Sequence, residues 1–156
     1  MKTVIKILLI LLICYLGFVV FIMYNAEKAP MLDISSLELN TLENSNYTFK
    51  SKRPKIVNIW ATWCGPCIKE FPAFQNIYDK YSDQVDFVMI SDEPVSKIQK
   101  WKTKNDYSFD FVVSDSSFST RPVTYFIQKD GEIISRKIGG ISENKLEEIT
   151  LDLLKK

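Results

Sequence analysis

The run Ile7 to Tyr24 contains no charged residue and consists almost entirely of large apolar side chains. A helix of about 20 apolar residues spans the hydrocarbon core of a bilayer, so this run predicts one transmembrane helix over residues 7–24. A cleaved signal peptide is the alternative. Its apolar part is usually shorter and ends at small residues, which Tyr24-Asn25-Ala26 matches poorly. We therefore expect residues 1–24 to be an uncleaved membrane anchor.

Two lysines set the expected orientation of this anchor. Lys2 and Lys6 precede the apolar run, and the positive-inside rule places them in the cytoplasm. The rest of the chain then faces the periplasm or the cell exterior, where disulfides persist. Residues 25–35 are polar, contain Pro30 and are predicted to be a linker. Residues 36–156 have the length of one domain.

The composition suits a folded domain and excludes several classes of function. Hydrophobic residues make up 46% of the chain, enough for a core. Lys+Arg 20 against Asp+Glu 19 leave a net charge of +1, so nucleic acid is not an expected partner. The chain has no histidine, which removes Ser-His-Asp triads and His-containing zinc sites. We expect no cofactor.

Predicted strands and helices alternate along residues 36–156. Lys55 to Trp60 is nearly all apolar, as a strand buried on both faces should be. A helix is expected from Cys64 to about Tyr81, because its apolar residues recur at spacings of three and four. The other expected elements are one or two short strands in 37–49, strand 86–90, helix 93–105, strands 109–113, 123–127 and 132–138, and a last helix after residue 142. This order predicts an α/β fold, a partly parallel sheet with helices on both faces.

Cys64 and Cys67 form a C-x-x-C pair between the buried strand and the helix. Half of a zinc site would need two more Cys or His ligands. The only other cysteine is Cys14 in the apolar run, so no metal site is predicted within a monomer. A structural disulfide that closes so small a loop stabilises little, which favours a redox dithiol. At a helix N-terminus the Cys64 thiolate is stabilised for attack on a disulfide, and Cys67, one turn on, is placed to resolve the product.

Two neighbours bear on this chemistry. Pro66 lacks an N–H where the start of a helix needs none, and it limits the freedom of the loop. Glu70 follows Cys67 by three residues and lies on the same helical side. Its carboxylate could accept the proton of Cys67. It could equally be a solvated helix residue, the commoner fate of glutamate, and the residues alone leave both interpretations open.

Three segments together resemble a known family. The run Val57 to Pro72 is similar to the strand, active-site loop and helix start of the thioredoxin superfamily, and more narrowly of its membrane-anchored TlpA/ResA-like branch. Pro122 to Ile127, followed by Asp130-Gly131, resembles the cis-proline strand and hairpin of that family. The resemblance covers about Leu37 to Lys156. It implies a thioredoxin-like fold, with a central mixed β-sheet flanked by helices.

The resemblance also implies roles for individual residues. Cys64 becomes the attacking thiol and Cys67 the resolving thiol. Classical thioredoxins carry a buried Asp where this chain has Asn58, which cannot accept a proton. In the tethered branch a glutamate at the position of Glu70 takes that role. Pro122 is expected to be cis, to face the dithiol and to help hold the substrate backbone.

Further substrate contacts are expected on both sides of the dithiol, from Trp63, Gly65 and Pro66 in the active-site loop and from Arg121 beside Pro122. Arg121 departs from the family, which usually has a small or apolar residue there. Its charge could favour the attacking thiolate, select acidic partners or point to solvent.

The expected function is therefore that of an extracytoplasmic thiol–disulfide oxidoreductase. It would reduce disulfides in exported proteins, since Gly65-Pro66 leans toward reduction. In related proteins the substrates include apocytochrome c and the electrons come from a membrane partner. The alternatives are an oxidant that forms disulfides and a non-catalytic binding or chaperone module. A peroxidase is disfavoured because the pattern Pro-x-x-x-Thr/Ser-x-x-Cys is absent.

Overall fold

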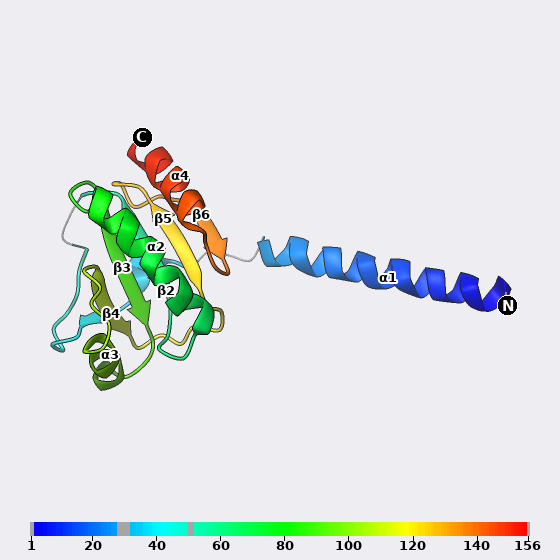
Figure 1. Cartoon of the computed structure of the whole chain (residues 1–156), viewed down its shortest axis with the longest axis horizontal. Coiled ribbons are helices and arrows are strands. Elements are labelled where there is room, and N and C mark those ends of the chain that lie inside the picture. Colours follow the sequence, from blue (N-terminus) through cyan, green and yellow to red (C-terminus); the bar gives the residue numbers. More distant parts are fainter. Residues whose placement is uncertain (1, 28–31, 50–51, 156) are drawn as a thin grey trace. The chain divides into compact units, whose positions relative to one another are not determined.

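A computed structural model describes residues 2–27, 32–49 and 52–155, and the chain falls into two units, 1–32 and 33–156 (Figure 1). In the first unit, α1 (Lys2–Glu27) is a single helix. Its stretch Ile5–Ile22 has a mean hydropathy of 2.9, so it is long and apolar enough to cross a membrane. Part of the predicted linker 25–35, residues 28–31 with Pro30, lies outside the described residues.

The second unit is built on a six-stranded mixed sheet with the order β1-β4-β3-β2-β5-β6. Its strands are β1 (Leu39–Thr41), β2 (Lys55–Ile59), β3 (Asp86–Ser91), β4 (Asp110–Ser114), β5 (Val123–Ile127) and β6 (Ile133–Ile138). Its helices are η1 (Ile34–Ser36), α2 (Gly65–Tyr81), α3 (Val95–Lys102) and α4 (Glu143–Leu154). β3 runs parallel to β2 and β4, whereas β5 is antiparallel to β2 and β6. The predicted mixed sheet flanked by helices is confirmed.

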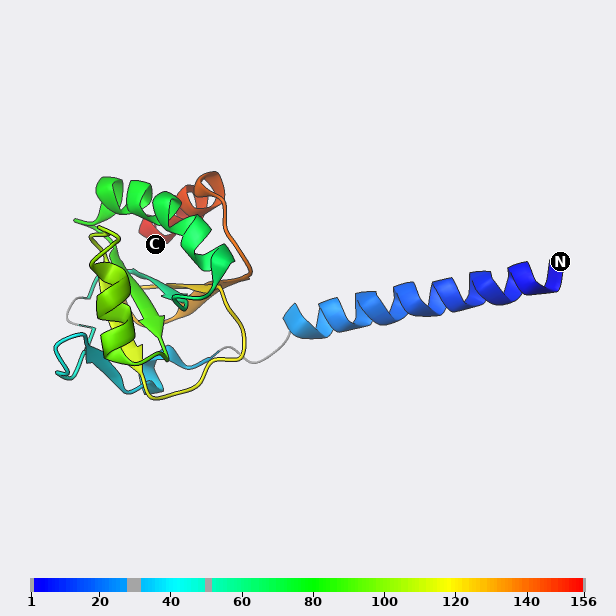
Figure 2. The ribbon, with the colours of Figure 1, turned by 60° about the horizontal axis from the view of Figure 1, so that its bottom comes forward.

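The three α-helices described in this unit lie on one face of the sheet, so the prediction of helices on both faces holds only for the short 3-10 helix η1 on the other face (Figure 2). Phe71 of α2, Ile98 of α3 and Leu146 of α4 belong to one core cluster, together with Ile56 and Trp60 from β2 and its end. The reason lies in the direction of the crossovers. β2-α2-β3 and β3-α3-β4 step the same way across the sheet, so two right-handed connections place α2 and α3 on one face.

The other face of the sheet is covered by η1 and by irregular chain around it (Figure 2). Val57 and Ile59 of β2 point to this face, because side chains alternate along a strand, and both are buried. Ile34 of η1 and Phe49 line one cavity together with Lys55, the first residue of β2. Figure 2 shows the segment around η1 on the opposite side of the sheet from α2 and α4. Burial on both faces explains why apolar residues of β2 point to either side of the sheet, Ile56 to one face and Val57 and Ile59 to the other.

The strand register brings two distant loops to one edge of the sheet. Ile59, the last residue of β2, pairs with Val123, the first residue of β5. The chain that leaves β2 leads directly into α2 at Gly65, and the chain that enters β5 comes from Pro122. The active-site loop and the proline loop therefore meet above the same end of two antiparallel neighbours.

Candidate active site

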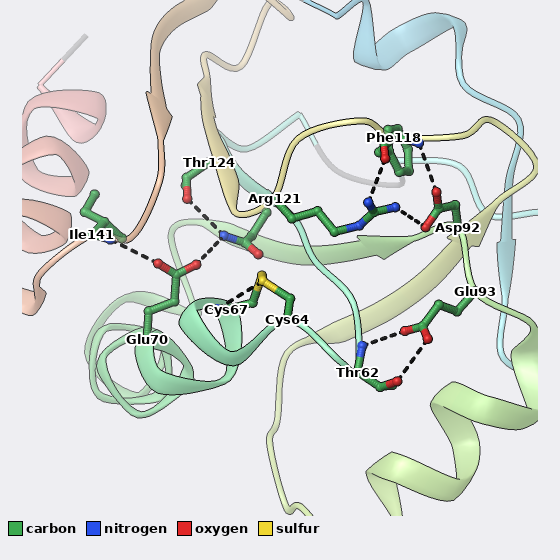
Figure 3. The surroundings of a disulfide bond; sticks show 11 residues. Thr62, Cys64, Cys67, Glu70, Asp92, Glu93, Phe118, Arg121, Thr124 and Ile141 are labelled. Atoms are coloured by element: carbon green, nitrogen blue, oxygen red, sulfur yellow. Dashed lines mark hydrogen bonds and ion pairs between the residues drawn. A yellow bond between two sulfur atoms is a disulfide. The ribbon is translucent and has the colours of Figure 1, made fainter.

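Cys64 and Cys67 form a disulfide at the first turn of α2 (Figure 3). Cys64 is the N-cap residue, and its Sγ accepts a hydrogen bond from the N–H of Cys67 at 3.3 Å. Both side chains are buried in this disulfide state, Cys67 completely. In the reduced state the same N–H group and the positive end of the helix dipole favour a thiolate on Cys64.

Glu70 is buried, which excludes the interpretation as a solvated helix residue. Its side chain is only 5% exposed. Oε1 accepts a hydrogen bond from Asn58 Nδ2 at 2.9 Å, and Oε2 accepts one from the Ile141 N–H at 3.0 Å (Figure 3). Burial raises the pKa of Glu70 to about 7, although these two hydrogen bonds act in the opposite direction. A carboxyl group with such a pKa can both accept and release a proton near neutrality.

Asn58 links this carboxylate to the central strands. Its Nδ2 also donates to Thr124 Oγ1 at 3.0 Å, because Asn58 of β2 and Thr124 of β5 are paired in the sheet. Its Oδ1 is buried and has no hydrogen-bond partner among the described residues. Sequence reasoning missed the contacts of Thr124 and Ile141. Thr124 could have been found as a polar residue in an apolar strand, whereas Ile141 acts through its backbone.

The peptide bond between Arg121 and Pro122 is cis, which confirms the expectation drawn from the family resemblance. Pro122 is buried, and its carbonyl oxygen accepts a hydrogen bond from the Gly139 N–H at 2.8 Å. This bond extends the pairing of β5 with β6 up to the proline. The contact of Pro122 with substrate stays a prediction.

Arg121 neither points freely to solvent nor carries an unbalanced charge. Its side chain is 9% exposed and forms an ion pair with Asp92. Nη1 donates to the Phe118 carbonyl oxygen at 2.6 Å. The guanidinium carbon lies 5.1 Å from the centre of the Trp63 ring, and Trp63 is 65% exposed beside Cys64. A general attraction of acidic partners by Arg121 is therefore disfavoured, because Asp92 already neutralises its charge.

A second carboxylate holds the start of the active-site loop. Glu93 accepts hydrogen bonds from the N–H of Thr62 at 2.5 Å and from Thr62 Oγ1 at 2.9 Å (Figure 3). It also pairs with Lys97 at 2.5 Å. Sequence reasoning missed Asp92 and Glu93, although two acidic residues directly after a buried strand were the available signal. The described residues contain no group of three or more His, Cys, Asp or Glu that could hold a metal ion.

Comparison with known proteins agrees with this geometry. The family model described as AhpC/TSA family matches residues 26–136. The chain is 25% identical to the thiol-disulfide oxidoreductase ResA of Bacillus cereus over 157 residues, which covers 91% of each chain. It is 29% identical to the sporulation thiol-disulfide oxidoreductase A of Bacillus subtilis over 137 residues, 80% of this chain and 82% of the relative.

A solved structure gives the same result in three dimensions. The crystal structure of StoA from Bacillus subtilis superimposes with a TM-score of 0.62 and 27% sequence identity. The match covers 78% of this chain and 99% of that chain. The family model spans more than half of the sequence, including Cys64, Cys67 and the cis-proline. The protein described here therefore belongs to the AhpC/TSA family, and its fold is that of the thioredoxin-like proteins.

Proposed function

We propose that this protein is a membrane-anchored thiol–disulfide oxidoreductase that reduces disulfides in proteins outside the cytoplasm. One observation carries the proposal: the Cys64–Cys67 disulfide at the start of α2 is followed, one turn on, by the buried carboxyl group of Glu70. The pair supplies two thiols when reduced. The carboxyl group supplies a proton acceptor in a chain that has no histidine.

The reaction begins with the reduced dithiol. The Cys64 thiolate attacks one sulfur of the substrate disulfide, and the other substrate sulfur leaves as a thiolate that takes a proton from water. Cys67 then gives its proton to Glu70 and attacks Cys64 Sγ. This step closes the Cys64–Cys67 disulfide and releases the second substrate thiolate, which is protonated in turn. Two electrons have passed from the enzyme to the substrate.

Two relatives, ResA and sporulation thiol-disulfide oxidoreductase A, carry names of the same enzyme class, the thiol–disulfide oxidoreductases. The reducing direction is supported by the dipeptide Gly65-Pro66, as in thioredoxin. A non-catalytic binding module is disfavoured because both cysteines are present and close enough to bond. Continued turnover needs an electron donor for the disulfide, and we propose a thiol–disulfide protein of the same membrane. We also propose that the substrates include proteins of cytochrome c maturation.

The direction of the reaction is testable through the reduction potential of residues 32–156. We expect a value near that of thioredoxin, about −270 mV, in glutathione or dithiothreitol buffers, and catalysis of insulin reduction by dithiothreitol. The fraction of disulfide at each buffer ratio can be measured by alkylation and mass spectrometry. A potential near −120 mV would instead assign the protein to the oxidants that form disulfides.

The orientation of the anchor gives a separate prediction. Because Lys2 and Lys6 precede the apolar part of α1, we expect the N-terminus in the cytoplasm and the second unit outside it. A reporter that is active only in the periplasm, fused after Lys156, should be active. A reporter that is active only in the cytoplasm should be silent at the same position. The reverse pattern would show that the positive-inside rule fails for this chain.

A further inference from the structure

The loop before Pro122 is held by side chains rather than by regular structure. Residues 115–121, all described, form neither helix nor strand. Asp92, at the end of β3, accepts a hydrogen bond from the Phe118 N–H at 2.9 Å and forms the ion pair with Arg121. Arg121 in turn donates to the Phe118 carbonyl oxygen at 2.6 Å. These three contacts close a ring that ties the loop to the sheet (Figure 3).

This ion pair is shielded from water. The side chains of Arg121 and Asp92 are 9% and 17% exposed. Burial opposes the charge on Asp92. The hydrogen bonds from Phe118 and Arg121 outweigh burial, so the pKa of Asp92 lies below its usual value. Asp92 is therefore ionised at neutral pH, and loss of either partner would leave a poorly solvated charge on the other.

The ring of contacts extends to the active-site loop through Trp63. The guanidinium of Arg121 lies over the Trp63 ring, at a distance typical of a cation–π contact. Trp63 is the most exposed large apolar side chain of the described residues in the second unit. One face of its ring is covered by Arg121. The contact limits the orientations that so exposed a side chain would otherwise adopt.

Asp92 and its neighbour Glu93 act on different sides of the same site. Asp92 holds the segment that leads to Pro122, and Glu93 holds Thr62, directly before Trp63. Two consecutive carboxylates at the end of β3 thus fix both backbone segments that border the disulfide. In Figure 3 the side chain of Arg121 runs from the edge of the dithiol toward Asp92, with its charged end directed away from the sulfur atoms.

We propose that Asp92 and Arg121 are positioning residues for the reaction with protein substrates. Their ion pair holds Trp63 and the segment before Pro122 in the arrangement against which the chain around a substrate disulfide docks. The inference rests on the proposed function and deepens it. A small disulfide reaches Cys64 without docking, so it depends far less on this arrangement.

The test compares two substrates in Asp92→Asn and Arg121→Met. With insulin as the protein disulfide, we expect KM to rise and kcat/KM to fall by about tenfold, the usual scale of a partly buried cation–π contact. With hydroxyethyl disulfide, kcat/KM should fall less than twofold. Iodide quenching of tryptophan fluorescence should increase in both variants. The contribution of Trp63 is taken as the difference from a Trp63→Phe protein, in which buried Trp60 and partly exposed Trp101 remain. Arg121→Lys, which keeps the charge, should restore part of the loss.

Matched controls separate this inference from the proposed function. Glu148→Gln removes an exposed ion pair with Lys145 on α4 and should leave both activities unchanged. In a Trp63→Ala background Arg121→Met should raise KM by a smaller factor than in the wild type, because only the contacts with Phe118 and Asp92 before Pro122 remain to be lost. Equal losses with both substrates, or an unchanged KM for insulin, would overturn the positioning role. A wild-type protein that reduces neither substrate would instead contradict the proposed function itself.

Discussion

Replacing Cys64 by serine is expected to lower insulin reduction to the rate of dithiothreitol alone, because a serine hydroxyl cannot attack a disulfide. Cys67→Ser should also stop turnover, but for a different reason. Its Cys64 can still attack, and the mixed disulfide with the substrate cannot be resolved. We therefore expect a covalent adduct of Cys67→Ser with insulin chains that Cys64→Ser does not form. Non-reducing electrophoresis and mass spectrometry detect it directly.

Cys14 provides the matched control for these variants. It is the free cysteine of the chain and lies in α1, within the proposed membrane span. Cys14→Ser should reduce insulin at the wild-type rate and form no adduct. The assignment of the two roles has its own check in the reduced protein. If iodoacetamide modified Cys67 faster than Cys64, the order of attack and resolution would be reversed.

The elements that were predicted well are those with a strong local pattern. β2 is a short apolar run, and α2 follows it with apolar residues at helical spacing. α3 is shorter than the expected helix 93–105 and begins at Val95. Pro94 directly precedes it, and Glu93 is bonded to Thr62 rather than built into a first turn. That contact joins residues far apart in sequence, so no local pattern indicates it.

The faces of the sheet show a second limit of sequence reasoning. The alternation of strands and helices predicts crossovers, but it does not give the direction in which each crossover steps across the sheet. β4 lies beyond β3 on the side away from β2, so α3 joins α2 on one face. The strand on the other side of β2 is β5. The connection from β4 to β5, residues 115–121, contains no helix that could cover the second face.

The candidate site divides in the same way. Short sequence motifs predict Cys64, Cys67 and the cis-proline, because each motif lies within a few consecutive residues. The surroundings of Glu70 and Arg121 are tertiary: Ile141 and Asp92 reach them from other elements. The sequence therefore left open whether either charge is solvated. Burial and hydrogen bonding, which only the fold supplies, decide both cases.

Glu70→Gln should slow the resolution of the mixed disulfide near neutral pH. The variant keeps the size of the side chain but cannot take the proton of Cys67. Because burial raises the pKa of Glu70 to about 7, the wild-type rate should increase as pH rises through that region and the carboxylate forms. We expect the variant to be slower by about a hundredfold at pH 7, the lower part of the usual range for a positioned proton acceptor. Stopped-flow measurement of single turnovers from pH 5 to 9 resolves this step.

The stability of the same variant tests whether burial raises the pKa of Glu70 to about 7. A carboxyl group whose folded pKa exceeds its unfolded value of about 4.5 stabilises the fold fully below that value, and this contribution is lost as pH rises through about 7. The free energy of unfolding of Glu70→Gln, relative to that of the wild type, should therefore increase between pH 4.5 and 7, by at most about 3 kcal/mol. Urea titrations across this range measure it. If the stability difference changes with pH but the turnover profiles superimpose, Glu70 is a buried structural acid and Cys67 loses its proton elsewhere. If both change together, the buried carboxyl group is the proton acceptor of the dithiol.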